Sequence, residues 1–121
     1  MVWQGVIIKE SLEDDSLFKL VKILKTKKSN LEGENNVLTF HNVEIPDKDK
    51  DQFIEKAIKS LKYKFYLHLV KDKLVYVVFK DHIFKFSKGY PELETARNYG
   101  KSVGIPEEQM PFEYLITHPF A

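Results

Sequence analysis

The chain contains no cysteine, which excludes a disulfide framework, a thiolate metal site and a cysteine nucleophile. Small secreted domains usually depend on disulfides, so this absence predicts a reducing, cytoplasmic location. The first residues, Met1 to Gly5, lack the basic flank and the small-residue cleavage site of a signal peptide. No apolar run approaches the ~18 residues of a membrane span, and we expect no membrane partner.

Arginine occurs once, at Arg97, and the formal net charge is only +1. Nucleic-acid sites depend on arginine for bidentate and stacked contacts. Lysines do alternate with aromatic residues between Lys62 and Lys88, as they do on some RNA-binding sheets. Lysines beside turns and on edge strands more often protect a sheet against aggregation. We therefore expect no specific nucleic-acid partner.

Motifs for catalysis and for phosphate binding are also missing. No serine lies in a G-x-S-x-G turn, and no glycine-rich phosphate loop is present. No two histidines have a spacing that would direct both imidazoles at one metal ion. The histidines are His41, His68, His82 and His118. We predict no metal and no cofactor.

Alternating acids between Asp47 and Asp51 have the pattern that opens a calcium loop of the EF-hand type. The pattern then fails, because Gln52 stands where the loop needs glycine and Ile58 stands where it needs a bidentate glutamate. These acids are better explained as the first turn of a helix, where negative charge complements the helix dipole.

The length of 121 residues predicts one domain over residues 1–121. The expected fold class is α+β: a largely antiparallel sheet of five or six strands with a C-terminal three-stranded meander, two main helices and an irregular C-terminal tail. Strands are predicted over 2–9 and 37–45, with Gly5 as the weak point of the first. Helices are predicted over 47–62 and 91–103.

Residues 17–28 fit two structures. Leu17, Phe18, Leu20, Val21 and Leu24 have helical spacing, but the following β-branched and lysine residues also suit a strand leading to a hairpin. We favour a short helix to about Phe18 followed by a strand. A loop is expected over 30–36, and Gly104 is expected to end the second main helix.

The most informative segment is 62–88, where short apolar runs are separated by two turns that share a Lys-Asp pair. It predicts a three-stranded antiparallel meander. Pairing Leu69 with Leu74 and Val78 with Ile83 defines two faces, which a slip of two residues leaves unchanged. The first face holds Phe65, Leu67, Leu69, Leu74, Tyr76, Val78 and Ile83. The second face holds Tyr66, His68, Val70, Val75, Val77, Phe79, Phe84 and Phe86.

Both faces of the meander are apolar, whereas a sheet with one solvated face should carry polar residues on that face. Something must therefore cover both sides. A sheet of about six strands is ~25 to 30 Å wide, which two helices could cover on one side only. Curling of the sheet, the C-terminal segment, a second subunit or a ligand must then close the other side, and coverage by the chain itself is the simplest of these.

Two hypotheses of function follow from the second face. The first is a non-catalytic binding or protein-interaction domain whose site includes Tyr66, His68, Phe79 and Phe84, either as a homodimer or with a protein or small-molecule ligand. The second is a small-molecule enzyme with acid/base chemistry around His68 and Tyr66, with Glu44 as a further candidate. A cavity with a carboxylate beside His68 would favour the enzyme, and continuous apolar packing would favour the binding domain.

Overall fold

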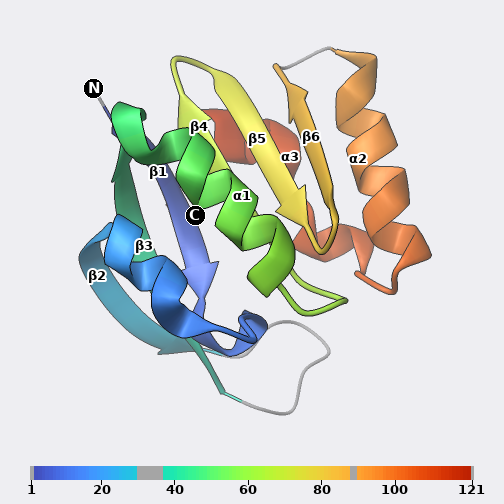
Figure 1. The fold of residues 1–121 in the computed structure, drawn as a ribbon. Coiled ribbons are helices and arrows are strands. Elements are labelled where there is room, and N and C mark those ends of the chain that lie inside the picture. The colour runs from blue at the N-terminus through green and yellow to red at the C-terminus, as the bar shows by residue number, and fades with distance from the viewer. Residues whose placement is uncertain (1, 30–36, 88–89, 121) are drawn as a thin grey trace.

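The structure, a computed structural model, describes residues 2–29, 37–87 and 90–120. Six strands form one antiparallel sheet in the order β2-β3-β1-β4-β5-β6 (Figure 1), which confirms the expected α+β class. The strands are β1 Val2–Ile8, β2 Lys22–Ser29, β3 Leu38–Pro46, β4 Tyr66–Lys71, β5 Leu74–Phe79 and β6 His82–Phe86. The α-helices are α1 Lys50–Ser60, α2 Pro91–Ser102 and α3 Phe112–Thr117. The 3-10 helices are η1 Lys9–Ser11, η2 Asp15–Leu20, η3 Asp47–Asp49 and η4 Glu107–Gln109.

Gly5 lies at the centre of the sheet, opposite Val43 of β3 and Leu69 of β4. A Cβ atom at this position would lie 2.0 Å from the backbone carbonyl oxygen of His68. Glycine at this position is what allows β4 to approach β1, so the residue predicted to be the weak point of the strand lies where the sheet packs most closely.

The meander forms as expected, with one change of register. Asp72 and Lys73 have φ angles of 52° and 69°, as a two-residue hairpin turn requires. This turn pairs Lys71 with Leu74, so Leu69 lies opposite Tyr76 instead of Leu74. The slip is two residues, and each side chain keeps its predicted face. The predicted pairing of Val78 with Ile83 is confirmed.

The first face of the sheet is covered by α1 and by η2 (Figure 1). The apolar stripe of α1 forms because Phe53, Ile54 and Ala57 recur at helical spacing, and all three are buried. They pack with residues of the central strands in a first core. Its strand residues are Trp3, Ile7, Val43, Ile45, Leu67, Leu69 and Val78.

Among the described residues, α2, η4, α3 and the tail that follows cover the part of the second face that β4, β5 and β6 form. These segments pack on β4, β5 and β6 in a second core. The core residues from the C-terminal segments are Leu93, Ala96, Ile105, Met110, Phe112, Leu115 and Ile116. The sequence left open what covers the second face of the meander. In the structure, the C-terminal segment covers it. The width of the sheet suggested that the two main helices would lie together on one side. In the structure they pack on opposite faces.

Local predictions agree closely with the observed elements. The favoured reading of residues 17–28 is confirmed, since η2 ends at Leu20 and β2 follows at Lys22. Gly104 has a φ angle of 95° directly after α2, as a left-handed helix terminator should. Beyond Pro106 the tail contains η4 and the short helix α3 where irregular turns were expected. The predicted loop over 30–36 lies outside the described residues.

Candidate binding surface

The structure brings the predicted site residues Tyr66, His68, Phe79 and Phe84 together, but beneath the C-terminal segment. Phe79 is 1% exposed and makes edge contacts with the rings of Phe84 and Tyr99, whose centroids lie 5.8 and 5.0 Å away. Phe84 is half-buried against the same Tyr99 ring. These aromatic side chains belong to the second core, so no open surface exists at Phe79.

Tyr66 holds the tail to the sheet. Its hydroxyl donates a hydrogen bond to the backbone carbonyl of Gln109, and its ring packs edge-on against Phe112 at a centroid distance of 5.5 Å. Burial raises the pKa of the phenol well above its ordinary value. A phenol that stays protonated and bonded to a carbonyl suits a structural role better than proton transfer.

His68, two residues after Tyr66 on the same face of β4, also holds the tail to the sheet. It is 5% exposed, and its Nε2 lies 2.7 Å from the backbone carbonyl oxygen of Pro119. Because a carbonyl oxygen only accepts, Nε2 carries the hydrogen and donates it. Burial lowers the pKa of the imidazole, and the bond to Pro119 raises it by less. Its cross-strand neighbours are the apolar residues Val6 and Val77.

The depressed pKa of His68 predicts how stability depends on pH. The unfolded chain takes up this proton near pH 6.5, and the folded protein only at lower pH. Between these values the unfolded state binds more protons, so stability is complete above about pH 6.5 and falls as the pH drops below it. The loss is about 1.4 kcal/mol for each unit by which the two pKa values differ.

Denaturant unfolding at pH 7.5 and pH 5.5 measures this loss, and His68→Gln serves as the comparison because its side-chain amide can still donate to the Pro119 carbonyl. The variant should lose less stability on acidification than the parent. Burial, and then the Lys9 charge, lower the pKa of His41 too, so any pH dependence that survives in the variant is assigned to His41. Equal losses in both proteins would contradict the role given to His68.

The part of the second face that β1, β2 and β3 form lies outside the second core. The strand residues of the second core come from β4, β5 and β6, and none comes from β1, β2 or β3. We use the term open face for the half-buried side chains that β1 and β3 present on this side. They are Gln4, Val6, Ile8, Phe40, Asn42, Glu44 and Pro46. Among the described residues, Val6, Ile8 and Phe40 belong to neither core.

The strand register arranges the open face in three rows that continue onto β2. The rows are Gln4–Glu44–Lys22, Val6–Asn42–Lys25 and Ile8–Phe40–Lys27. The register shift between Ile23 and Lys25 keeps the lysines in line with these rows. The result is an apolar and amide surface with a basic rim along β2.

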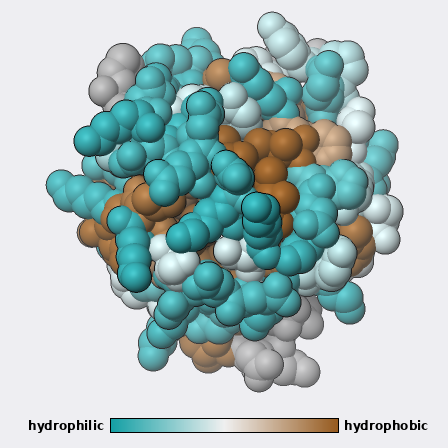
Figure 2. Space-filling view, viewed as in Figure 1, coloured by the Kyte–Doolittle hydropathy of each residue, from teal (hydrophilic) through white to brown (hydrophobic). Residues whose placement is uncertain are grey.

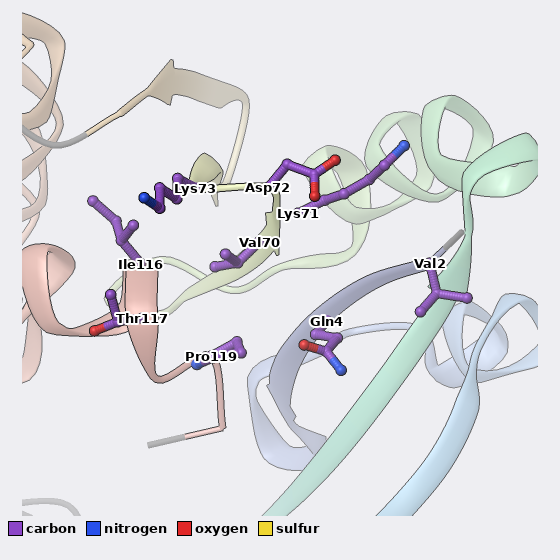
Figure 3. A pocket seen from close by; sticks show the side chains of 9 residues that line it. All are labelled: Val2, Gln4, Val70, Lys71, Asp72, Lys73, Ile116, Thr117 and Pro119. Atoms are coloured by element: carbon purple, nitrogen blue, oxygen red, sulfur yellow. The ribbon is translucent and has the colours of Figure 1, made fainter.

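A groove of about 490 Å³ lies where the open face meets the tail. Figure 3 shows Ile116, Thr117 and Pro119 of the C-terminal segment on one side, Val2 and Gln4 of β1 on the other, and the β4–β5 turn along a third. Val70 lies between them. Among the described residues, the Gln4 side chain has no hydrogen-bond partner. The lining combines apolar and polar or charged side chains, and such a mixture can hold a ligand by apolar contact and by hydrogen bonds.

The remaining histidines are spread over the molecule. His41 Nδ1 lies 2.7 Å from the Thr26 hydroxyl, His82 packs on the ring of Tyr99, and His118 stacks on Tyr114. Within the part of the chain that the structure describes, no three metal-ligating side chains of His, Asp or Glu converge. Over the same residues, no helix combines the length and the apolarity that crossing a membrane would require.

The α1 side of the molecule faces the viewer in Figures 1 and 2. Figure 2 shows this side as mostly hydrophilic, with hydrophobic side chains in separate patches. Arg97, the single arginine, is unavailable to a partner. It is buried between α2 and α3, where it forms ion pairs with Glu94 and Glu113 and packs over the Phe112 ring.

Comparison with protein families, with curated proteins and with solved structures gives no match to this chain. The assignment of a binding surface therefore depends on the geometry alone. Sequence reasoning missed the open face because it concentrated on the aromatic meander. The sequence carried little signal for it, because Val6 is as apolar as the buried Trp3 and Ile7, and Gln4 alone marks the half-buried side of β1.

Proposed function

We propose that the protein is a non-catalytic binding domain whose interaction surface is the open face together with the groove beside the tail. One observation carries this proposal: Val6, Ile8 and Phe40 form an apolar strip on regular strands that neither core covers. Contiguous apolar surface with a polar rim is typical of interaction sites. A cytoplasmic location and a homodimer are parts of the same proposal.

The proposal moves the site from the covered half of the second face to its uncovered half. Two of the residues predicted from the sequence, His68 and Tyr66, contribute to the proposed site indirectly. His68 and Tyr66 hold Pro119 and Gln109, and through them the tail that forms one wall of the groove. The enzyme hypothesis gains no support, since both side chains bond to backbone carbonyls inside apolar packing. Glu44 lies on the open face, one row away from Val6.

Photocrosslinking at position 40 tests the proposal. Phe40 is replaced by p-benzoylphenylalanine, a similar aromatic residue, and the full chain is irradiated in its native cells. We expect a discrete adduct of defined mass, because the benzophenone would sit on the interaction surface. An adduct of twice the chain mass would identify the homodimer. Adding Val6→Lys should abolish either product.

The matched control carries the same photoreactive residue in place of Tyr63, which is 62% exposed and lies far along the chain from the open face. It should give no discrete product. Equal products at both positions, or none at position 40, would overturn the proposal. Thermal melting of each variant confirms that the fold is retained before the adducts are compared.

A further inference from the structure

The β2 edge of the sheet is the most exposed regular element of the structure. β2 pairs with β3 on one side, and no other strand of the described residues lies on the other. All eight of its residues are exposed. An edge strand of this kind leaves a row of backbone N–H and C=O groups unpaired, which is a template for a strand from another chain.

Lysines dominate the side chains along this edge. Lys22, Lys25 and Lys27 lie on the open-face side, and Lys28 lies on the opposite side. None of them forms an ion pair with a described residue. By contrast, Lys50, Lys71, Lys80 and Lys101 each have an acidic partner within the fold. Among the described residues, Lys22 has the Glu44 carboxylate opposite it in the register, and Lys25, Lys27 and Lys28 have no acidic residue opposite them.

A second copy of the chain suits this edge poorly. Antiparallel pairing of β2 with β2 would place one row of lysines directly opposite another, and like charges opposed across strands are destabilising. Opposite charges in the same positions are stabilising by roughly 0.2 to 1 kcal/mol for each pair. The charge pattern thus favours an acidic strand over a homodimer at this edge.

Two apolar side chains add a second element of recognition. Ile23 is 45% exposed and Leu24 42% exposed, and the register shift of β2 lies between Ile23 and Lys25. A partner that alternates acidic and apolar residues would place acids beside the lysine row and apolar side chains on the side of Ile23, because strand side chains alternate between faces.

We propose that an extended acidic segment of another protein adds to β2 as a further strand, with alternating acidic and apolar residues. This inference rests on the proposed function and names the chemistry of the partner. Backbone pairing supplies the shared geometry, and the lysine row supplies the selectivity for acids.

The test uses a synthetic peptide of alternating Glu and Val, as long as β2 at eight residues, with both ends blocked. We expect calorimetry to detect binding and amide NMR shifts to concentrate in 22–29. Lys25→Glu with Lys27→Glu should weaken binding about tenfold or more, because two attractive pairs become repulsive. The control pair, Lys48→Glu with Lys62→Glu, makes the same change of net charge at exposed positions away from β2 and should have little effect.

Three further outcomes decide between explanations. A peptide N-methylated on its pairing edge keeps its charge but cannot form the ladder, so it should not bind, and undiminished binding would overturn strand addition. If the control pair weakens peptide binding as much as the β2 pair does, the effect comes from net charge alone, and the inference is overturned. Tighter binding of a thymidine oligonucleotide than of the peptide, lost in the same lysine variant, would assign the edge to a nucleic acid instead.

The result is separable from that of the photocrosslinking experiment. Failure of the Glu-Val peptide to bind, with a persistent adduct at position 40, overturns the acidic strand and leaves the binding domain in place. Binding of the peptide at β2 without an adduct at position 40 supports the acidic strand and overturns the open face as the interaction surface.

Discussion

Replacing Phe79 by alanine should lower the free energy of unfolding by about 3 to 5 kcal/mol, the usual cost of removing a buried phenylalanine. Phe79 is 1% exposed and packs against the rings of Tyr66, Phe84 and Tyr99. The cavity left behind lies between the sheet and α2, where neighbouring rings can close it only in part. Urea unfolding monitored by circular dichroism measures the change, and the mass in solution should stay the same.

Phe40→Ala is the matched control, because it makes the same substitution on the open face. Phe40 is half-buried and belongs to neither core, so we expect a smaller loss, of about 2 kcal/mol, because part of the ring is already exposed and no enclosed core cavity is left. Equal losses for the two variants would show that the open face is ordinary core. Little loss of stability in Phe79→Ala, with a change of mass, would instead make the covered half of the sheet an interface between subunits.

Gly5→Ala should be at least as damaging, with an expected loss of about 3 kcal/mol or more, at the upper end of overpacking costs. The added Cβ would lie 2.0 Å from the carbonyl oxygen of His68, a backbone atom that cannot move alone. Relief requires β1 and β4 to separate at the centre of the sheet, which breaks ladder hydrogen bonds on that side. Loss of the cooperative unfolding transition would be the extreme form of this result.

Gly100→Ala provides the comparison, since its Cβ would also be too close to a neighbour, at 2.3 Å from the Met110 sulfur. A methionine side chain can rotate away, and alanine stabilises a helix by roughly 1 kcal/mol over glycine. The net change should therefore stay within about 1 kcal/mol. If Gly100→Ala proves as costly as Gly5→Ala, the distinction between backbone and side-chain obstruction is wrong.

Local elements were predictable where neighbouring residues decide them. The turn at Asp72 and Lys73 follows from short apolar runs that flank a polar pair, and α1 follows from an apolar stripe after an acidic first turn. The end of α2 was predictable because Gly104 readily adopts a positive φ angle. In each case the information lies within a few residues.

The C-terminal helix shows where local information ends. The segment that forms α3 starts after Pro111 with no side-chain cap, so nothing in its own sequence stabilises a helix strongly. Phe112, Leu115 and Ile116 are nevertheless buried in the second core, and this packing holds the helix. An expectation of irregular turns was reasonable from the sequence and was corrected by a contact with distant strands.

The site was predicted only to the level of a sheet face. The alternation along the meander placed Tyr66, His68 and Phe79 on one side, and the structure has them there. Which part of that side is covered depends on the tail, whose attachment through Pro119 and Gln109 joins residues more than 40 positions apart. Such contacts leave no periodic signal in the sequence.

By itself, the sequence determined the α+β class, the meander, the two faces of its strands and the two main helices, because hydrophobic periodicity and turn chemistry act over a few residues. The tertiary structure decided the strand order, the placement of α1 and α2 on opposite faces, and the division of the second face into a covered and an open half. These features depend on which surfaces can be buried together at the least cost in unpaired polar groups, and that choice is made between segments far apart in the chain.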